Sequence, residues 1–363
     1  MKPIKIVYLI RTFNTGGAEK LLLHWLQYIN ANPSINIACR LVIWQKDSVE
    51  LSTQLPADQV KIFNIWHWSG IVGLIKLRKW LKQYNPDIVH SHLPASGLLS
   101  VIVKATGLTF CSIYSEHSLV NRAGLSFRLH GRVYHFHQSI HFVSNQVKRV
   151  VDEADFYHYK AFLLLPNAVP FQPCLRDTKI LEKGRMVVGT LANFRKLKQL
   201  PQMVELMAQI EQMYPDTFDF CIGGDGPEYG NVLQAISDQN MQHKIKLSGR
   251  QHNTVDFLAG IDVFLLTSST EGLPLTLIEA LQQGCLPAIA FESGLQEVPV
   301  DAFGIRFSLG DPSALLKFLS VLNKLTLPKL KYLQQETRDF FLKQYDFNQY
   351  FNALIHHYNH SLN

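Results

Sequence analysis

The stretch Phe264–Ala290, FLLTSSTEGLPLTLIEALQQGCLPAIA, decides the fold because it reads as strand, loop, helix and strand in succession. An apolar run, Phe264–Leu266, is followed by turn residues and by Pro274, which suits the first position of a helix. Apolar residues at helical spacing continue to Gly284, which ends the helix, and Leu286–Ala290 reads as the second strand. This order of elements predicts an α/β fold with a parallel sheet.

Two glutamates in this stretch carry the functional signal. Glu271 lies in the loop before the helix, and Glu279 lies within the helix. Between them, the backbone N–H groups of Gly272, Leu273 and Leu275 lie at the positive end of a helix dipole, which binds phosphate. A diphosphate there would have one carboxylate near the hydroxyls of a ribose and another near those of a second sugar. Either glutamate alone is more often an ordinary surface residue of a first helical turn, so the pair predicts a nucleotide-sugar site only together with its surroundings.

The string E-G-L-P-L-T-L-I-E-A resembles the paired-glutamate signature of the retaining family-4 glycosyltransferases, which have the GT-B fold. The resemblance implies two facing Rossmann-like domains with parallel sheets and a C-terminal helix that crosses back to the first domain. It implies an acceptor-binding domain at 1–170 with helix 346–363, and a nucleotide-sugar domain at 184–345. Glu271 would bind hydroxyls of the donor sugar, and Glu279 would bind the ribose.

A basic loop, ANFRKLKQ, follows the first expected strand of the second domain. It resembles the family's loop in which an Arg and a Lys hold the donor phosphates, so Arg195 and Lys198 take those roles by resemblance. The string departs from the family pattern, because Asn193 stands where the family often has its Arg and Gln199 where it usually has Gly. Lys198 is therefore the firmer match, and a solvated basic loop is the alternative.

Two glycine-containing turns complete the donor side of the expected site. Gly16 and Gly17, in NTGGAE after the first strand, let the backbone approach a ligand closely, and the resemblance places this loop beside the donor diphosphate. IKLSGR resembles a family turn whose backbone borders the base, which points to Gly249 and Arg250. A plain turn is the alternative in the first case.

Histidines at the ends of two expected strands mark the acceptor side. His117 occupies the place where the family has a histidine beside the donor sugar and the acceptor, and there it orients hydroxyls instead of acting as a nucleophile. His92 is an acceptor-site candidate, with His90 a weaker one, although a strand-end histidine is more often structural. Asn121 is a further acceptor candidate, and Arg122 is an unassigned polar residue. Two histidines without an acidic partner make a poor metal site, so we expect none.

Composition fits a two-domain globular protein of 363 residues, with 47% hydrophobic and 18% charged residues. Its five cysteines are scattered without a C-x-x-C pair, which indicates a reducing cytosol. The N-terminal MKPIKIVYLI reads as a strand and not as a signal peptide. No apolar run reaches the ~20 residues that span a bilayer.

Charge is divided unevenly along the chain. Met1–Leu165 holds 18 Lys and Arg against 9 Asp and Glu, whereas the rest is slightly acidic. Within the basic half, Ser69–Tyr84 reads as an amphipathic basic helix preceded by Trp66 and Trp68. In the simpler interpretation, the apolar side of this helix packs on the sheet and its lysines are solvated. In the alternative, the helix lies against acidic lipid headgroups. The two interpretations are compatible because a packed helix still has an outer face. We find no nucleic-acid-binding motif, so we expect the basic half to contact an anionic membrane surface. The expected location is the cytoplasm, with peripheral attachment to the inner face of the cytoplasmic membrane.

These features together predict a retaining glycosyltransferase that moves a sugar from a nucleoside diphosphate donor to a hydroxyl of a glycan or lipid-linked acceptor. Synthesis of bacterial cell-surface polysaccharide or lipopolysaccharide is the expected setting. We expect no metal or other cofactor, because the chain has no Asp-x-Asp string and its cationic loop offsets the diphosphate charge. A catalytically silent scaffold of the same fold and a nucleotide-sugar epimerase remain as alternatives. The donor sugar, the base and the acceptor cannot be read from the sequence.

Overall fold

The computed structural model describes residues 2–14, 16–45, 49–65, 70–117, 131–154, 157–173 and 185–362. Its contacts divide the chain into two compact units. The first unit comprises Met1–Ala168 together with Phe347–Asn363, and the second comprises Val169–Asp346. Four of the residues named above lie outside the described residues, namely Asn121, Arg122, Trp66 and Trp68. Residues 174–183, most of the segment between the two expected domains, lie outside them as well.

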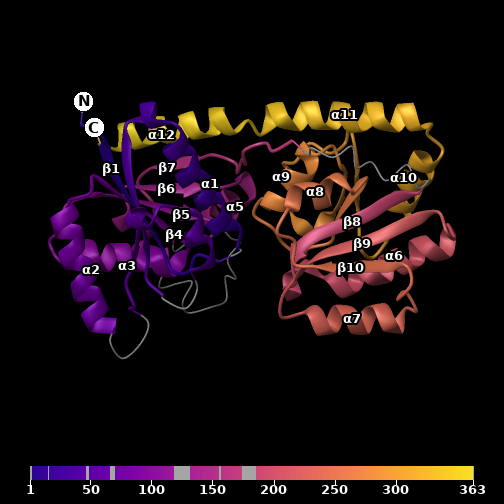
Figure 1. Cartoon of the computed structure of the whole chain (residues 1–363), viewed down its shortest axis with the longest axis horizontal. Coiled ribbons are helices and arrows are strands. Elements are labelled where there is room, and N and C mark those ends of the chain that lie inside the picture. The colour runs from indigo at the N-terminus through magenta and orange to yellow at the C-terminus, as the bar shows by residue number, and fades with distance from the viewer. Residues whose placement is uncertain are drawn as a thin grey trace. The chain divides into compact units, whose positions relative to one another are not determined.

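The first unit is built on a parallel sheet of seven strands in the order β3-β2-β1-β4-β5-β6-β7 (Figure 1). The strands are β1 (Ile4–Ile10), β2 (Ile37–Ile43), β3 (Val60–Ile62), β4 (Ile88–His92), β5 (Cys111–Glu116), β6 (Ser139–Phe142) and β7 (Phe162–Leu164). β1, β4 and β5 are buried along most of their length, as expected of central strands in a parallel sheet that is covered on both faces.

Helices cover both faces of this sheet. The helices of the unit are α1 (Gly17–Ala31), α2 (Gly70–Tyr84), α3 (Pro94–Ala105), α5 (Asn145–Asp152) and α12 (Phe347–Leu362). On one face, Val7 and Val89 pack in a core with Leu77 of α2 and Leu99 of α3. On the other face, the ring of Tyr8 meets Trp25 of α1, and its hydroxyl lies 3.3 Å from that of Tyr358 of α12. Because strand side chains alternate between faces, the residues on either side of Val89 point toward α1 and α12.

The second unit has a parallel sheet of six strands in the order β10-β9-β8-β11-β12-β13. The strands are β8 (Met186–Asn193), β9 (Phe218–Asp225), β10 (Ile245–Gly249), β11 (Val263–Leu266), β12 (Leu286–Ala290) and β13 (Ile305–Phe307). Its helices are α6 (Leu200–Met213), α7 (Tyr229–Asp238), α8 (Thr254–Ala259), α9 (Leu275–Gln282), α10 (Ser313–Asn323) and α11 (Leu327–Gln344). The order turns back between β8 and β11, which are neighbours in the sheet although β9 and β10 separate them in the chain. Ligands bind open α/β sheets at such a point, outside the carboxyl ends of the strands.

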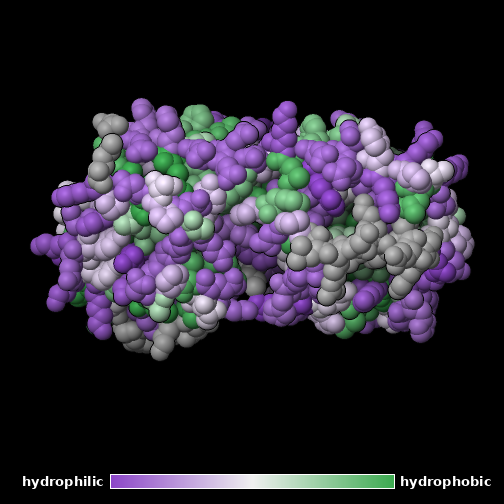
Figure 2. Space-filling view, turned by 45° about the horizontal axis from the view of Figure 1, so that its top comes forward, coloured by the Kyte–Doolittle hydropathy of each residue, from purple (hydrophilic) through white to green (hydrophobic). Residues whose placement is uncertain are grey.

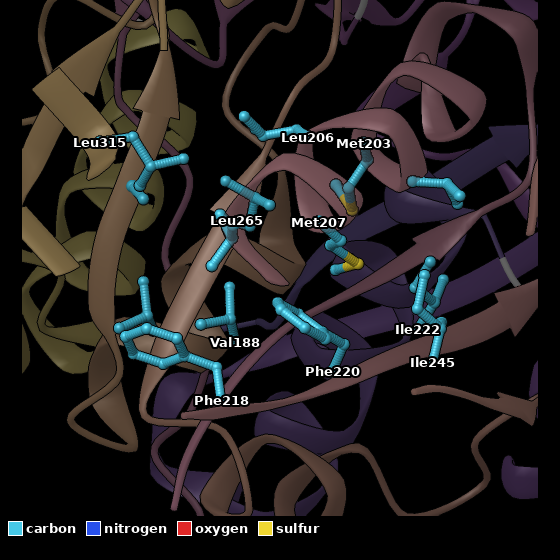
Figure 3. Close-up of a cluster of buried hydrophobic side chains, with 14 of the residues drawn as sticks. Val188, Met203, Leu206, Met207, Phe218, Phe220, Ile222, Ile245, Leu265 and Leu315 are labelled. Atoms are coloured by element: carbon cyan, nitrogen blue, oxygen red, sulfur yellow. The ribbon is translucent and has the colours of Figure 1, made fainter. Parts of the chain in front are cut away.

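The core of the second unit lies between this sheet and α6, α7 and α10. Met203 and Met207 of α6 point toward Val188, Phe220 and Leu265 of the strands (Figure 3). Burial of this apolar surface, at about 25 cal/mol per Å², holds the strand ends in place for the loops that follow them. The prediction of an α/β fold with two parallel sheets is thus confirmed. In the described part of the chain, no helix combines the length and the apolar character needed to cross a bilayer.

Candidate active site

The loop before α9 is held by a backbone hydrogen bond to the turn after β12 and by buried side chains. α9 begins at Leu275, and Pro274 is its N-cap residue with extended backbone (φ −70°, ψ 133°). Our prediction that Pro274 is the first helical residue is wrong by one position, because its ψ is not helical. The backbone N–H of Glu271 donates to the carbonyl of Ser293 at 2.9 Å, and the side chains of Leu273 and Leu275 are buried. The loop therefore holds Gly272–Leu275 rigidly at the positive end of the helix.

Lys198 and Glu271, from loops far apart in the sequence, form a salt bridge. Lys198 Nζ contacts Glu271 Oε1, and the two side chains are 17% and 10% exposed. Ser268 Oγ donates to the same carboxylate oxygen at 2.6 Å. Both of these bonds go to Oε1, and neither goes to Oε2.

Hydrogen bonds between two loops position this pair. Lys198 ends a short 3-10 turn, Lys196–Lys198, that follows β8, whereas Ser268 and Glu271 follow β11. Thr267 Oγ1 donates to the carbonyl of Lys198 at 3.0 Å. One residue earlier in the turn, the carbonyl of Leu197 accepts the N–H of Ser269 at 2.8 Å. Since β8 and β11 are adjacent and parallel, their carboxyl ends meet at one edge, and these bonds join the two loops there.

The other predicted donor-site residues of the second unit lie along the same edge or on α9. Arg195 is exposed directly before the 3-10 turn, and Arg250 is exposed directly after β10. Gly249 closes β10 with a positive φ of 62°. Glu279 is half-buried on α9. The structure thus brings Lys198 and Glu271 into direct contact, with Arg195 after β8 and Arg250 after β10, which β9 separates from β8 in the sheet.

A glycine near the end of β9 shapes this edge. Gly224 has φ +125°, and a Cβ there would lie 1.8 Å from the carbonyl oxygen of Ala192 in β8. Only glycine allows the strand to run so close to its neighbour with this backbone conformation. Gly224 therefore keeps the end of β9 beside the end of β8, ahead of the loop that carries Lys198.

The glycine pair of the first unit differs in its surroundings. Gly16 is the N-cap residue of α1, and an ideal Cβ there would lie 2.1 Å from Glu19 Oε2. Glu19 is buried, and its Oε1 accepts a hydrogen bond from Thr12 at 3.1 Å. Gly17 is exposed, and an ideal Cβ there has no heavy atom within 4 Å. Gly16 thus makes room for a buried carboxylate, while Gly17 presents bare backbone at the surface.

A layer of histidines lies on the face of the first sheet that α1 and α12 cover. His90 and His92 alternate along β4, and their rings stack with centroids 4.6 Å apart. The register pairs His92 with Ser115 of β5, so His117 lies just beyond. His92 Nδ1 is 2.9 Å from His117 Nε2; His92 is fully buried, and His117 is half-buried.

A chain of hydrogen bonds runs through this layer in a direction that one carbonyl sets. His141 Nε2 lies 3.2 Å from the carbonyl oxygen of Leu165, which only accepts, so this nitrogen carries the proton. The Nδ1 of a neutral His141 must then accept, and Ser115 Oγ, at 2.8 Å, donates to it. Because the hydroxyl proton of Ser115 is donated to His141, Ser115 Oγ accepts a hydrogen bond from His90 Nε2 at 2.7 Å.

The same chain continues into the C-terminal helix. Because His90 Nε2 is protonated, its Nδ1 accepts, and Tyr358 of α12 donates its hydroxyl proton at 2.7 Å. The hydroxyl oxygen of Tyr358 in turn accepts from Tyr8, at 3.3 Å. α12 is therefore joined to the sheet by directed polar bonds as well as by aromatic packing.

Burial keeps these histidines neutral. It lowers the pKa of His117 to about 3 and that of His141 to about 4, with repulsion from a neighbouring histidine as a smaller cause. Burial likewise lowers the pKa of His90 and of His92 well below the usual value, again with the neighbouring histidines adding to it. An uncharged ring has one donor and one acceptor, which is what the bonds above require.

The sequence did not predict three polar residues of the candidate site. Ser268 belongs to the turn residues before Pro274, and its bond to Glu271 depends on the shape of the loop. Ser115 and His141 were missed although a signal exists. Polar residues recur at a spacing of two in consecutive buried strands, in HSH, SEH and SIH. That spacing predicts a polar layer on one face of a sheet.

Comparisons with known proteins agree with this architecture. A family model described as "Glycosyl transferases group 1" matches residues 175–329, and one described as "Glycosyltransferase Family 4" matches residues 45–171. The α-1,4-N-acetyl-D-galactosaminyltransferase of Campylobacter jejuni that acts on a diNAcBac-PP-undecaprenol-linked glycan is 25% identical over 330 residues, 88% of each chain. A putative glycosyltransferase of Bacillus subtilis, EpsF, is 21% identical over 98% of this chain and 96% of its own.

Solved structures share the fold at low identity. Anabaena Alr3699/HepE in complex with UDP-glucose has a TM-score of 0.81 and 16% identity, covering 99% of this chain and 100% of that one. A glycosyltransferase of Rickettsia africae has a TM-score of 0.81 and 17% identity, covering 100% and 99%. The chain belongs to the family-4 glycosyltransferases (glycosyl transferases group 1), retaining enzymes of the GT-B fold that use nucleoside diphosphate sugars as donors.

Proposed function

We propose that this enzyme transfers a sugar from a UDP-sugar to a hydroxyl of a glycan carried on polyprenyl diphosphate. The Campylobacter relative is named for an undecaprenol diphosphate-linked acceptor. An Escherichia coli relative, 26% identical over 79% of each chain, is named a UDP-Gal:α-D-GlcNAc-diphosphoundecaprenol α-1,3-galactosyltransferase. Relatives named for capsule and O-antigen synthesis support the same setting of cell-surface polysaccharide.

The salt bridge between Lys198 and Glu271 is the observation that carries the proposal. It sets an ammonium group beside the loop that opens α9, while the contacts of Glu271 with Lys198 and Ser268 both use Oε1 and leave Oε2 out of them. In our proposal Lys198 and Arg195 stabilise the leaving diphosphate, together with the backbone N–H groups of Gly272, Leu273 and Leu275. Preorganised charge of this kind is usually the largest single contribution to catalysis.

In our proposal the other residues bind successive parts of the donor, from the transferred sugar to the base. Glu271 binds hydroxyls of the transferred sugar through Oε2, and Glu279 binds the ribose. Gly249 and Arg250 border the base, and Gly16 and Gly17 border the diphosphate. The sugar moves with retention as the acceptor hydroxyl attacks the face that the diphosphate leaves, and the departing phosphate oxygen takes the proton of that hydroxyl.

The acceptor side is uncharged in this proposal. His117 orients hydroxyl groups at the reacting centre and takes no proton, because burial lowers its pKa to about 3. His92 and Asn121 are the other acceptor-side residues we propose. Asn121 lies outside the described residues.

A lipid-linked acceptor requires the enzyme to work at a membrane, and α2 with α3 is the surface we propose for that contact. Ile71 is 74% exposed and Ile75 60% exposed on α2, and the exposed Lys76 and Lys79 lie on the same helix. On α3, Leu98 and Ile102 are also exposed. The surface visible in Figure 2 is mainly hydrophilic, with apolar side chains in small groups. Exposed aliphatic groups beside lysines suit an anionic headgroup layer at the inner face of the membrane.

Ligand-induced stabilisation tests the donor site. We expect UDP, but not GDP or ADP, to raise the melting temperature of the wild type, because a ligand that binds only the folded state stabilises it by mass action. Glu279→Ala should weaken that shift, and Glu336→Ala, a change at an exposed position of α11, should not. No shift with any nucleotide at millimolar concentration, for a folded protein, contradicts the donor assignment.

A transfer assay tests the reaction. Incubation with UDP-sugars and polyprenyl diphosphate-linked glycans should yield a glycan heavier by one sugar residue, detected by mass spectrometry, with UDP as the other product. Interconversion of free nucleotide sugars without transfer would instead identify an epimerase. Nucleotide binding without any transfer would identify a binding subunit.

Sedimentation with vesicles tests the membrane surface. The wild type should sediment with vesicles rich in anionic lipid at low salt, and the double substitution Ile71→Ser, Ile75→Ser should reduce this. Val321→Ser, which changes an exposed aliphatic residue on α10, is the matched control. Equal sedimentation of all three proteins contradicts the assignment of α2.

A further inference from the structure

His92 has one ring nitrogen against His117, and the other is buried without a hydrogen-bond partner among the described residues. The first is Nδ1, which lies 2.9 Å from His117 Nε2, and the second is Nε2. The ring is held by Trp25, whose centroid is 5.3 Å away in an edge arrangement, and by the stacked ring of His90. Within the residues that the structure describes, His92 is thus a buried imidazole with one hydrogen-bond contact.

The unpartnered nitrogen decides which histidine donates. Two ring nitrogens 2.9 Å apart share one proton, so one donates and the other accepts. If His117 donated from Nε2, a neutral His92 would accept at Nδ1 and carry its own proton on Nε2, where a buried N–H would meet no acceptor in the described part of the chain. If His92 donates from Nδ1, its Nε2 holds only a lone pair. A buried N–H without an acceptor is rarer and more costly than an unused lone pair, so the second arrangement is favoured.

We infer that His92 is a positioning residue that holds His117 in the tautomer with its proton on Nδ1, so that His117 meets the substrate only as a hydrogen-bond donor. The Nε2 lone pair of His117 is used by His92, and no lone pair remains to take a proton from an acceptor hydroxyl. The tautomer follows from the contacts of His92 alone. That the Nδ1 proton meets an oxygen of the sugar or of the acceptor rests on the function proposed above.

The lowered pKa values of both rings agree with this arrangement. A protonated pair would place two positive rings in contact, and burial opposes the charge on each of them. At neutral pH both rings are therefore uncharged, which is the state in which a single proton position has meaning.

Nitrogen NMR of the ligand-free protein tests the tautomer directly. In protein labelled with ¹⁵N-histidine, protonated and unprotonated ring nitrogens resonate at different shifts, and the coupling pattern tells Nδ1 from Nε2. The signals of His117 are those that disappear in His117→Phe. We expect a neutral ring with the proton on Nδ1. A proton on Nε2 overturns the inference, whatever the enzyme's substrate proves to be.

Two replacements of His92 test whether it acts through His117. His92→Asn keeps an N–H donor near the position of Nδ1 but loses ring packing, whereas His92→Phe keeps a ring against Trp25 but has no donor. We expect the Asn variant to keep the Nδ1–H tautomer and to exceed the Phe variant in kcat/KM by about three- to tenfold, the range for one hydrogen bond. In a His117→Phe background this difference should vanish.

The opposite order of the two variants overturns the inference, because packing alone makes Phe the milder change. A difference that persists in the His117→Phe background overturns it as well. If no donor supports transfer by the wild type, the proposed function fails while the NMR measurement still decides the tautomer. If the Asn variant does not fold, the wild-type spectrum and the tautomer mixture in His92→Phe decide it.

Discussion

The histidine layer of the first unit consists of uncharged polar groups, whereas the Lys198–Glu271 pair of the second unit consists of opposite charges. In the first unit, His90, His92 and His141 are fully buried, and burial makes them neutral, so each has one donor and one acceptor with a set direction. In the second unit, the paired side chains of Lys198 and Glu271 retain 17% and 10% exposure and meet as opposite charges.

The difference follows from what each unit is proposed to bind. A diphosphate carries charge that must be balanced as it leaves, and an ammonium group near water supplies that balance without a large desolvation cost. Hydroxyl groups of a sugar carry no charge and are oriented by donors and acceptors whose direction is fixed. The two kinds of site should therefore differ in their response to acidity and to the removal of one charge.

Acidity should affect the neutral layer most strongly. The pKa of His117 is lowered to about 3 and that of His141 to about 4, against about 6.5 in the unfolded chain, so between these values the unfolded state binds more protons. The unfolding free energy therefore rises with pH through this window. The contribution of these histidines is fully present above about pH 6.5 and is lost progressively toward pH 4. Each histidine contributes about 1.4 kcal/mol per pH unit inside the window.

Urea unfolding between pH 7.5 and 4.5 measures this effect. We expect the unfolding free energy to fall by at least the equivalent of two protons per pH unit below pH 6. His135→Gln, a change at an exposed position, should leave the slope unchanged. If the unfolding free energy changed by the equivalent of less than one proton per pH unit, the buried histidine rings would already be charged in the folded protein.

Removal of a single charge should affect the second unit through catalysis. Lys198→Met leaves the diphosphate without its ammonium group, and we expect kcat to fall about 10²- to 10³-fold, as when one stabilising donor is removed from a developing anion. Lys196→Met changes an exposed lysine of the same 3-10 turn and is the control. Similar losses in both variants would show that general positive charge matters, and not the contact with Glu271.

The loss in Lys198→Met should also depend little on ionic strength. A partly buried pair is screened much less than exposed charges, so the ratio of wild-type to variant rates should persist from low to high salt. A ratio that shrinks strongly with salt would place the role of Lys198 in long-range attraction of the donor.

One hydroxyl group tests how α12 is held. Tyr358→Phe leaves the buried Nδ1 of His90 without its donor, which should lower the unfolding free energy by about 1–3 kcal/mol. Tyr332→Phe, on the exposed face of α11, should change it little. Since the ring of Tyr358 still packs in the variant, a neutral effect would mean that packing alone docks the helix.

The sequence predicted elements better than it predicted contacts. β12 matches the expected strand Leu286–Ala290, and β1 lies within the expected N-terminal strand MKPIKIVYLI, because their apolar spacing is local. The C-terminal helix was expected at 346–363, but the bond of Tyr358 to His90 joins residues 268 positions apart. Local spacing carries no information on such a pair.

The site shows the same limit. Lys198 and Glu271 were each found by motif, yet their contact depends on β8 and β11 being neighbours in the sheet. His92 and His117 were each noted at a strand end, and the register of β4 with β5 then brings the two rings together. Residue types are local properties, whereas partners are set by the order and register of the strands.

The glycine pair tests whether the first unit meets the diphosphate with backbone instead of charge. In Gly16→Ala the new Cβ would lie 2.1 Å from Glu19 Oε2, so the buried carboxylate must move, and we expect a loss of about 1 kcal/mol in unfolding free energy. In Gly17→Ala the methyl group meets nothing within 4 Å, and the less flexible unfolded chain should stabilise the protein by about 0.4–1 kcal/mol. If bare backbone at Gly17 borders the donor, the same methyl group should weaken UDP binding several-fold despite the gain in stability. Calorimetric titration with UDP decides, because unchanged affinity in Gly17→Ala would remove this loop from the donor site.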